Sequence, residues 1–97
     1  MQRMSELKSF KQLHVWQRSM ELAKEIYRLT ADLPPEERYG LISQLRRCAV
    51  SVPSNIAEGF KCRNPAEYRQ FLAIAAGSAA EVETQLILSR ELFAVDT

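Results

Sequence analysis

Apolar residues recur every three or four positions across the centre of this chain, and the series continues past a proline. The members of the series are Leu41, Leu45, Ala49, Val52, Ile56 and Phe60. Side chains at this spacing share one face of an α-helix. Pro53 lies within this series. A proline costs roughly 3 kcal/mol in a helix interior, because it lacks an N–H and clashes with the preceding turn. The pattern therefore predicts a helix in which other groups offset the proline.

Polar residues surround this proline. Ser51, Ser54 and Asn55 carry short side chains that can bond to nearby backbone carbonyls. We therefore expect Pro53 to kink the helix, while one of these side chains satisfies a freed or crowded backbone group. We interpret the segment as a device for bundle shape and subunit packing, with Gly59 as a helix terminator. The residues assigned to this structural motif are Pro53, Ser54, Asn55, Glu58 and Gly59.

The rest of the chain predicts two further helices and no strand. The expected helices cover about residues 13–33, 35–62 and 65–94, within one domain over residues 1–97. Pro34 and Pro35 separate the first two, and Asn64 followed by Pro65 is a strong start signal for the third. In the first helix, a second apolar stripe adjoins the main one and predicts a wide buried face. It consists of Trp16, Met20, Ala23 and Tyr27.

Small residues fill the centre of the third predicted helix. Gly77 lies among alanines in residues 73–80, and glycine costs about 1 kcal/mol relative to alanine in a helix interior. A close approach by a neighbouring helix is one compensation for that cost. The alternative is a simple alanine-rich stretch of good helix propensity.

The predicted helix lengths favour an elongated antiparallel bundle. Helices of about 20, 25 and 30 residues extend over about 30, 38 and 45 Å. A long third helix with two partners in its own chain leaves apolar surface uncovered. We therefore expect an all-α, up-and-down bundle of the four-helix type, with the fourth helix short or absent and another copy completing the packing. Homo-oligomerisation also suits a domain of 97 residues, whose buried fraction is limited.

Composition indicates an ordinary soluble protein, with 46% hydrophobic and 26% charged residues. We find no apolar stretch that approaches the roughly 20 residues of a membrane span, and the first residues lack the apolar core of a secretory signal. We therefore expect a cytoplasmic protein with no membrane partner. Cys48 and Cys62 are expected to be about 21 Å apart along one helix, too far for a disulfide within the chain.

Charge is distributed unevenly, although the net charge is only +1. Residues 38–69 hold six basic and two acidic residues, whereas residues 70–97 hold one basic and four acidic ones. One hypothesis is a basic surface for the phosphates of RNA or DNA. The other is pairing with acids of the same or a neighbouring subunit, which for Arg46 and Arg47 would be Glu58, Glu81, Glu83 or Glu91. The residues proposed to contact nucleic acid or another subunit are Arg38, Arg46, Arg47, Lys61, Arg63 and Arg69.

Catalytic and metal-binding patterns are not evident. His14 is the single histidine, and the serines lack a nucleophile signature. Glu81 and Glu83 are two residues apart, so they do not share a helical face. We expect no catalytic residue, no metal site, no cofactor and no enzymatic activity.

Six segments resemble the family of 23S rRNA intervening-sequence proteins. They are residues 15–17, 26–30, 37–41, 44–47, 51–59 and 81–86. The resemblance covers about residues 10–93, and the proline-containing segment is its most specific part. It implies a small cytoplasmic bacterial four-helix bundle that assembles into a ring-like homopentamer, and it identifies no catalytic residue.

A related branch of that family implies an alternative function. These are the accessory variability proteins of diversity-generating retroelements, basic pentamers that bind nucleic acid and a reverse transcriptase. The present chain is nearly neutral, and it ends where family members continue into a fourth helix. We therefore expect either a truncated sequence or packing that is completed by another subunit.

Overall fold

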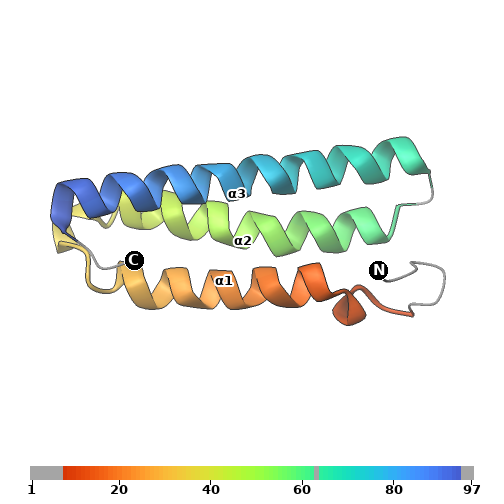
Figure 1. Ribbon diagram of the computed structural model, residues 1–97, viewed down its shortest axis with the longest axis horizontal. Coiled ribbons are helices and arrows are strands. Elements are labelled where there is room, and N and C mark those ends of the chain that lie inside the picture. Colours follow the sequence, from red (N-terminus) through yellow and green to blue (C-terminus); the bar gives the residue numbers. More distant parts are fainter. Residues whose placement is uncertain (1–7, 63, 95–97) are drawn as a thin grey trace.

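The computed structural model describes residues 8–62 and 64–94, and within them it contains three α-helices and no strand. The helices are α1 (His14–Thr30), α2 (Leu41–Phe60) and α3 (Pro65–Phe93). Two short 3-10 turns precede α1 and α2, at Phe10–Gln12 and Pro35–Glu37. The predicted all-α helical bundle is confirmed (Figure 1).

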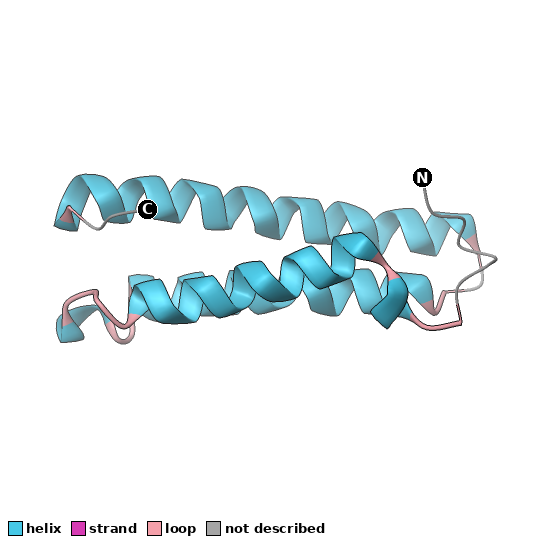
Figure 2. Cartoon of the chain, turned by 60° about the horizontal axis from the view of Figure 1, so that its bottom comes forward, coloured by secondary structure: helices cyan, strands magenta, loops and turns pink. Residues whose placement is uncertain are grey.

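The three helices run antiparallel in chain order, with α2 packed against both of the others (Figures 1 and 2). The backbones of α1 and α3 do not approach each other as closely as either approaches α2. The resulting molecule is elongated, measuring 45 × 21 × 19 Å, as the helix lengths predict.

The core follows the apolar series of α2. Leu45, Ala49, Val52 and Ile56 are all buried. The first two pack in a cluster with Ile26 of α1 and Val82 of α3, while the other two pack with Leu13 and Ala75. Both outer helices thus bury their apolar faces against the same stripe of α2.

Two helix boundaries differ from the prediction by three residues or more, and the others agree within two. α1 ends at Thr30 rather than residue 33 and continues into a turn, although Leu33 still reaches the core. α2 begins at Leu41 rather than residue 35, because Pro35–Glu37 forms a separate 3-10 turn and the backbone of Gly40 leaves the helical region at φ −109° and ψ −112°. The start of α3 agrees with its signal, since the Asn64 side chain accepts a 2.8 Å hydrogen bond from the backbone N–H of Glu67.

Pro53 lies inside a helix that continues without a break from Leu41 to Phe60. Ser54 Oγ donates to the carbonyl of Val50 at 2.8 Å, and Asn55 Nδ2 donates to the carbonyl of Ser51 at 2.8 Å. Two polar side chains therefore bond to carbonyls close to the proline. They do not reach Ala49, whose carbonyl would bond to an N–H at position 53. The bend of the helix stays a prediction.

Neither glycine has the role that the sequence predicts for it. Gly59 does not end α2 but is buried within it, where an added Cβ would lie 3.2 Å from Phe71 Cβ. Gly77 was expected at a close helix contact, yet an added Cβ there would meet nothing within 4 Å. The close approach between helices is therefore at Gly59, and the expected contact at Gly77 is wrong within this chain.

A large part of the apolar surface of α3 is uncovered. Its exposed large hydrophobic residues are Ile74, Ile87, Leu88 and Leu92. By length and composition α3 could cross a membrane, and only 17% of its most apolar window is buried. The expectation that no stretch is apolar enough for a span is therefore wrong, although one such helix is weak evidence for a membrane protein.

Candidate interaction face between α1 and α2

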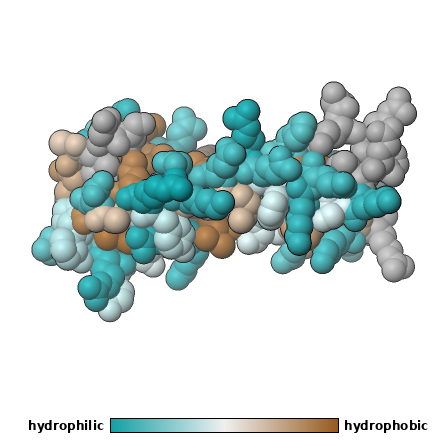
Figure 3. All heavy atoms as spheres, turned by 90° about the horizontal axis from the view of Figure 1, so that it is seen from below, coloured by the Kyte–Doolittle hydropathy of each residue, from teal (hydrophilic) through white to brown (hydrophobic). Residues whose placement is uncertain are grey.

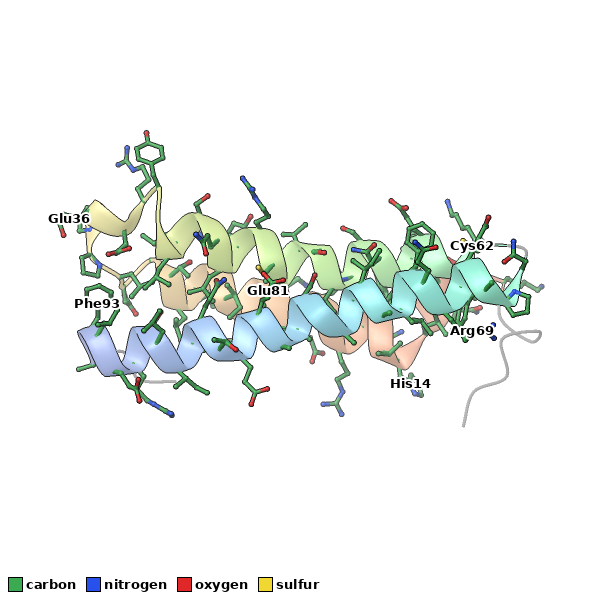
Figure 4. All side chains as sticks on the ribbon, turned by 90° about the horizontal axis from the view of Figure 1, so that it is seen from above. His14, Glu36, Cys62, Arg69, Glu81 and Phe93 are labelled. Carbon is green, nitrogen blue, oxygen red and sulfur yellow. The ribbon has the colours of Figure 1, made fainter. Side chains whose placement is uncertain are left out.

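The structure separates the basic residues that the sequence groups together. Arg38, Arg46 and Arg47 line one hollow near the end of the bundle where α2 begins. Lys61 and Arg69 lie at the opposite end of the bundle, near the connection between α2 and α3. Figure 4 labels Arg69 at this end, far from Glu36. Arg63 lies outside the described residues. These residues therefore do not form one continuous basic face.

Arg46 is held against α1. Its Nε donates to Thr30 Oγ1 at 2.9 Å, one terminal nitrogen donates to the carbonyl of Tyr27 at 3.4 Å, and the guanidinium lies 4.5 Å from the centre of the Tyr27 ring. Arg47 is exposed. Among the described residues, neither arginine pairs with the glutamates proposed as partners. Arg46 is therefore first a structural residue, because it ties α2 to the last turn of α1.

A basic hollow opens beside Arg46, with a volume of about 510 Å³. Tyr39 in this hollow is 88% exposed, so its ring is free to contact a partner. Three guanidinium groups and two tyrosines meet here, although the sequence distributes them over twenty-one positions. We define the basic hollow by Tyr27, Arg38, Tyr39, Ile42, Arg46 and Arg47.

An apolar groove adjoins the basic hollow, with a volume of about 640 Å³. The two share Tyr27 and Val50, so they form one continuous face between α1 and α2. Lys24 and Arg28 also line the groove, and its lining contains no acidic residue. We define the apolar groove by Trp16, Met20 and Tyr27 of α1 together with Val50, Pro53 and Ala57 of α2.

The second apolar stripe of α1 has a different role from the one predicted. Ala23 is buried, but Trp16 and Met20 are half-buried and Tyr27 is exposed. The stripe therefore lines the groove, and Ala23 is its one member that belongs to the buried core. Hydrophobic side chains reach the surface between hydrophilic ones when the molecule is viewed from the α1 side (Figure 3).

Cys48 lies outside this face, between α2 and α3. Its Sγ is 3.2 Å from Glu81 Oε2, in the direction of a thiol that donates to the carboxylate. Burial, followed by the bond to Glu81 and its negative charge, raises the pKa of Cys48. The thiol is therefore a poor nucleophile, because the thiolate is the reactive form. In the part of the chain that the structure describes, no three or more His, Cys, Asp or Glu residues lie together where they could hold a metal ion.

Together, these observations define a helical-bundle protein with an open face between α1 and α2. The sequence profile of the 23S rRNA-intervening sequence protein family matches residues 11–97. The chain belongs to this family, as the six segments indicate. No curated protein matches the chain at a significant level.

Sequence reasoning missed two components of the face. Tyr39 belongs to no site that the sequence predicts, yet it is the most exposed of the large hydrophobic residues. The sequence pattern around Pro53 concerns only its own helix. Its place in a groove with Trp16 depends on how α1 packs against α2. The helical periodicity of Trp16, Met20 and Tyr27 was the available signal for the groove.

Proposed function

We propose that this protein acts as a homo-oligomeric, adaptor-like helical-bundle scaffold with no catalytic activity of its own, and that five copies form the assembly, as the family resemblance implies. The observation that carries the proposal is the uncovered apolar surface of α3. Ile74, Leu88 and Leu92 are 45%, 42% and 60% exposed in a single chain. Burial of apolar surface is worth roughly 25 cal/mol per Å², so association of copies through such a surface is favourable.

The apolar groove supports the same proposal from the other side of the molecule. It exposes Tyr27 and Val50 and opens to solvent beside the half-buried Trp16 and Met20. Contiguous exposed apolar surface rimmed by polar groups is typical of protein interaction sites. One chain thus carries two apolar surfaces that association can bury.

The test is the mass of the full chain in solution. We expect light scattering coupled to size exclusion to give five times the chain mass of 11.1 kDa at micromolar concentration. A monomer at that concentration would contradict the proposal. A smaller closed oligomer would retain the scaffold and correct the number of copies.

The basic hollow favours a second candidate function, the binding of RNA or DNA. Guanidinium groups suit phosphates, and an exposed tyrosine offers a surface on which a base can stack. Here Arg38 and Arg47 are exposed, and Tyr39 lies beside them. In the related retroelement branch such binding accompanies a reverse transcriptase, which would be the protein partner under this hypothesis.

A matched pair of double variants tests this second function. We expect Arg38→Ala with Arg47→Ala to weaken binding of a single-stranded RNA and to reduce its salt dependence. Lys61→Ala with Arg69→Ala removes the same charge at the far end of the bundle and should change binding little. Equal effects of the two pairs, or binding that does not respond to salt, would contradict a site in the basic hollow.

A further inference from the structure

We infer that the apolar groove of one copy receives the outer edge of α3 from a second copy, so that the two surfaces form a head-to-tail contact. The inference rests on the proposed homo-oligomer and names its interface. The α3 ridge consists of Ile74, Glu81 and Leu88. Four observations carry it: the spacing of the ridge, its charge, the height of its residues along the bundle, and its separation from the groove.

The ridge has the spacing of a helix-packing surface. Ile74, Glu81 and Leu88 are seven residues apart, and side chains at this interval lie above one another along a helix. Both apolar members are more than two-fifths exposed, at 45% and 42%. Glu81 lies at the boundary with α2, as its contact with Cys48 shows (Figure 4). The ridge therefore follows the side of α3 that borders α2, and its two apolar residues are exposed there.

Charge on the two surfaces is complementary. The ridge carries the carboxylate of Glu81 between its two apolar residues. The groove contains Lys24 and Arg28 and no acidic lining residue, and Arg28 also pairs with Glu25 of its own helix, which lies outside the lining. An apolar ridge with a central acid fits an apolar groove that carries cations, because opposite charges select partner and register.

The heights of the two surfaces also agree. Ser78 Oγ bonds to Ser51 Oγ at 2.8 Å, which brings Ile74 to the height of the groove segment of α2 that includes Pro53 and Ala57. Copies related by rotation about an axis parallel to the bundle keep this height. Ile74 of one copy would then face the apolar groove of the next copy.

The same reasoning places the acid of the ridge near the cations of the groove. Glu81 has the height of Cys48, since these side chains are 3.2 Å apart. Arg46 bonds to Thr30 and Tyr27 in α1, so Lys24 and Arg28 lie at about the height of residues 46–50. Glu81 of one copy therefore reaches the level of Lys24 and Arg28 of the next.

The two surfaces occupy different sides of one chain. The groove lies between α1 and α2, whereas the ridge follows the edge of α3, so a chain cannot fill its own groove with its own ridge. A contact between two unlike surfaces repeats from copy to copy and closes into a ring when the rotation permits. Each copy in such a ring buries both surfaces.

Charged substitutions at exposed positions test the contact without disturbing the core. We expect Ile74→Glu in the ridge and Val50→Glu in the groove each to reduce the oligomer to monomer, measured by light scattering with circular dichroism as the check on folding. The control is Ile87→Glu, because Ile87 is on the same helix with a similar exposure, 41%, but not on the ridge. This control should retain the oligomer mass.

Mixing the two variants tests whether the surfaces are unlike. Ile74→Glu retains an intact groove and Val50→Glu retains an intact ridge, so an equimolar mixture can form one intact contact. We expect heterodimers in the mixture, whereas each variant alone is a monomer. A mixture that stays monomeric would contradict the head-to-tail contact.

The wild-type mass separates failure of this inference from failure of the proposed function. A monomeric wild type would contradict both. An oligomeric wild type whose mass survives Ile74→Glu or Val50→Glu would overturn the named interface and leave the homo-oligomer standing. An equal loss of mass in Ile87→Glu would also overturn the named interface.

Discussion

At the scale of single residues, two arginines that are adjacent in the sequence have separate roles. Arg46 donates to Thr30 and Tyr27 and covers the Tyr27 ring, while Arg47 is exposed. The direction in which each side chain leaves α2 decides this difference, since neighbours on a helix point about 100° apart. Charge counting cannot distinguish two such residues.

Removal of Arg46 is expected to destabilise the fold. Arg46→Ala loses two hydrogen bonds and a cation–aromatic contact, so we expect the free energy of unfolding to fall by about 1–2 kcal/mol. Arg47→Ala should change it by less than about 0.5 kcal/mol, as surface substitutions usually do. Urea denaturation of both variants measures the difference, and equal effects would show that the contacts of Arg46 contribute nothing.

Cys48 predicts a loss of stability in alkaline solution. Burial and Glu81 raise its pKa above the ordinary thiol value of 9.0, so the unfolded chain releases the proton first as the pH rises. The contribution is fully present below the unfolded pKa and is lost as the pH passes through the folded pKa. We expect the free energy of unfolding to decrease more steeply above pH 9 in the wild type than in Cys48→Ala. Parallel curves would contradict this coupling.

At the scale of secondary-structure elements, α2 is the central helix of the bundle. It packs against both other helices and tolerates an internal proline. The side chains of Ser54 and Asn55 bond to its carbonyls near the proline, and Gly59 allows α3 to approach. Gly59 therefore serves the packing of α2 against α3, while Ser54 and Asn55 bond within α2 itself.

Two glycine substitutions should have opposite signs. Gly59→Ala inserts a methyl group 3.2 Å from Phe71 Cβ, and we expect a net loss of about 1 kcal/mol because crowding exceeds the gain in helix propensity. Gly77→Ala meets nothing within 4 Å, so propensity alone should raise the free energy of unfolding by about 1 kcal/mol. Urea denaturation checks both, with the mass of each variant as control. A gain at Gly59 would show that the helices readily move apart.

At the scale of the whole molecule, the elongated shape sets the balance of buried and exposed surface. Three helices in a body 45 Å long and 21 Å wide share a narrow core. The most apolar window of α3 is only 17% buried. The proposed association of copies would add the burial that the single chain lacks.

The melting temperature should therefore depend on protein concentration. Assembly of folded chains stabilises the native state by mass action, so we expect dilution from about 100 to 1 µM to lower the melting temperature measured by circular dichroism. Ile74→Glu provides the comparison, since a chain that cannot assemble should melt at one temperature throughout. A wild type with no concentration dependence would indicate that assembly contributes nothing to stability over this range.

Most of the fold could be predicted from local sequence. The 3.6-residue periodicity around Leu45 and Ile56 identified the buried face of α2, and Asn64 with Pro65 marked the start of α3. The boundaries at Gly40 and Thr30 could not, because the 3-10 turn and the final turn of α1 depend on how the connection between α1 and α2 closes. The role of Gly59 likewise depends on Phe71, which belongs to another helix.

The sequence by itself determined the helices, their apolar faces and the family, because these depend on spacing and residue type along one segment. The tertiary structure alone decided which residues meet. It put Trp16 beside Pro53 in the apolar groove, gathered Arg38, Arg46 and Tyr39 in one hollow, and left Lys61 and Arg69 at the other end. The physical reason is that a surface depends on the relative rotation and height of packed helices, and the periodicity of each helix alone does not contain that information.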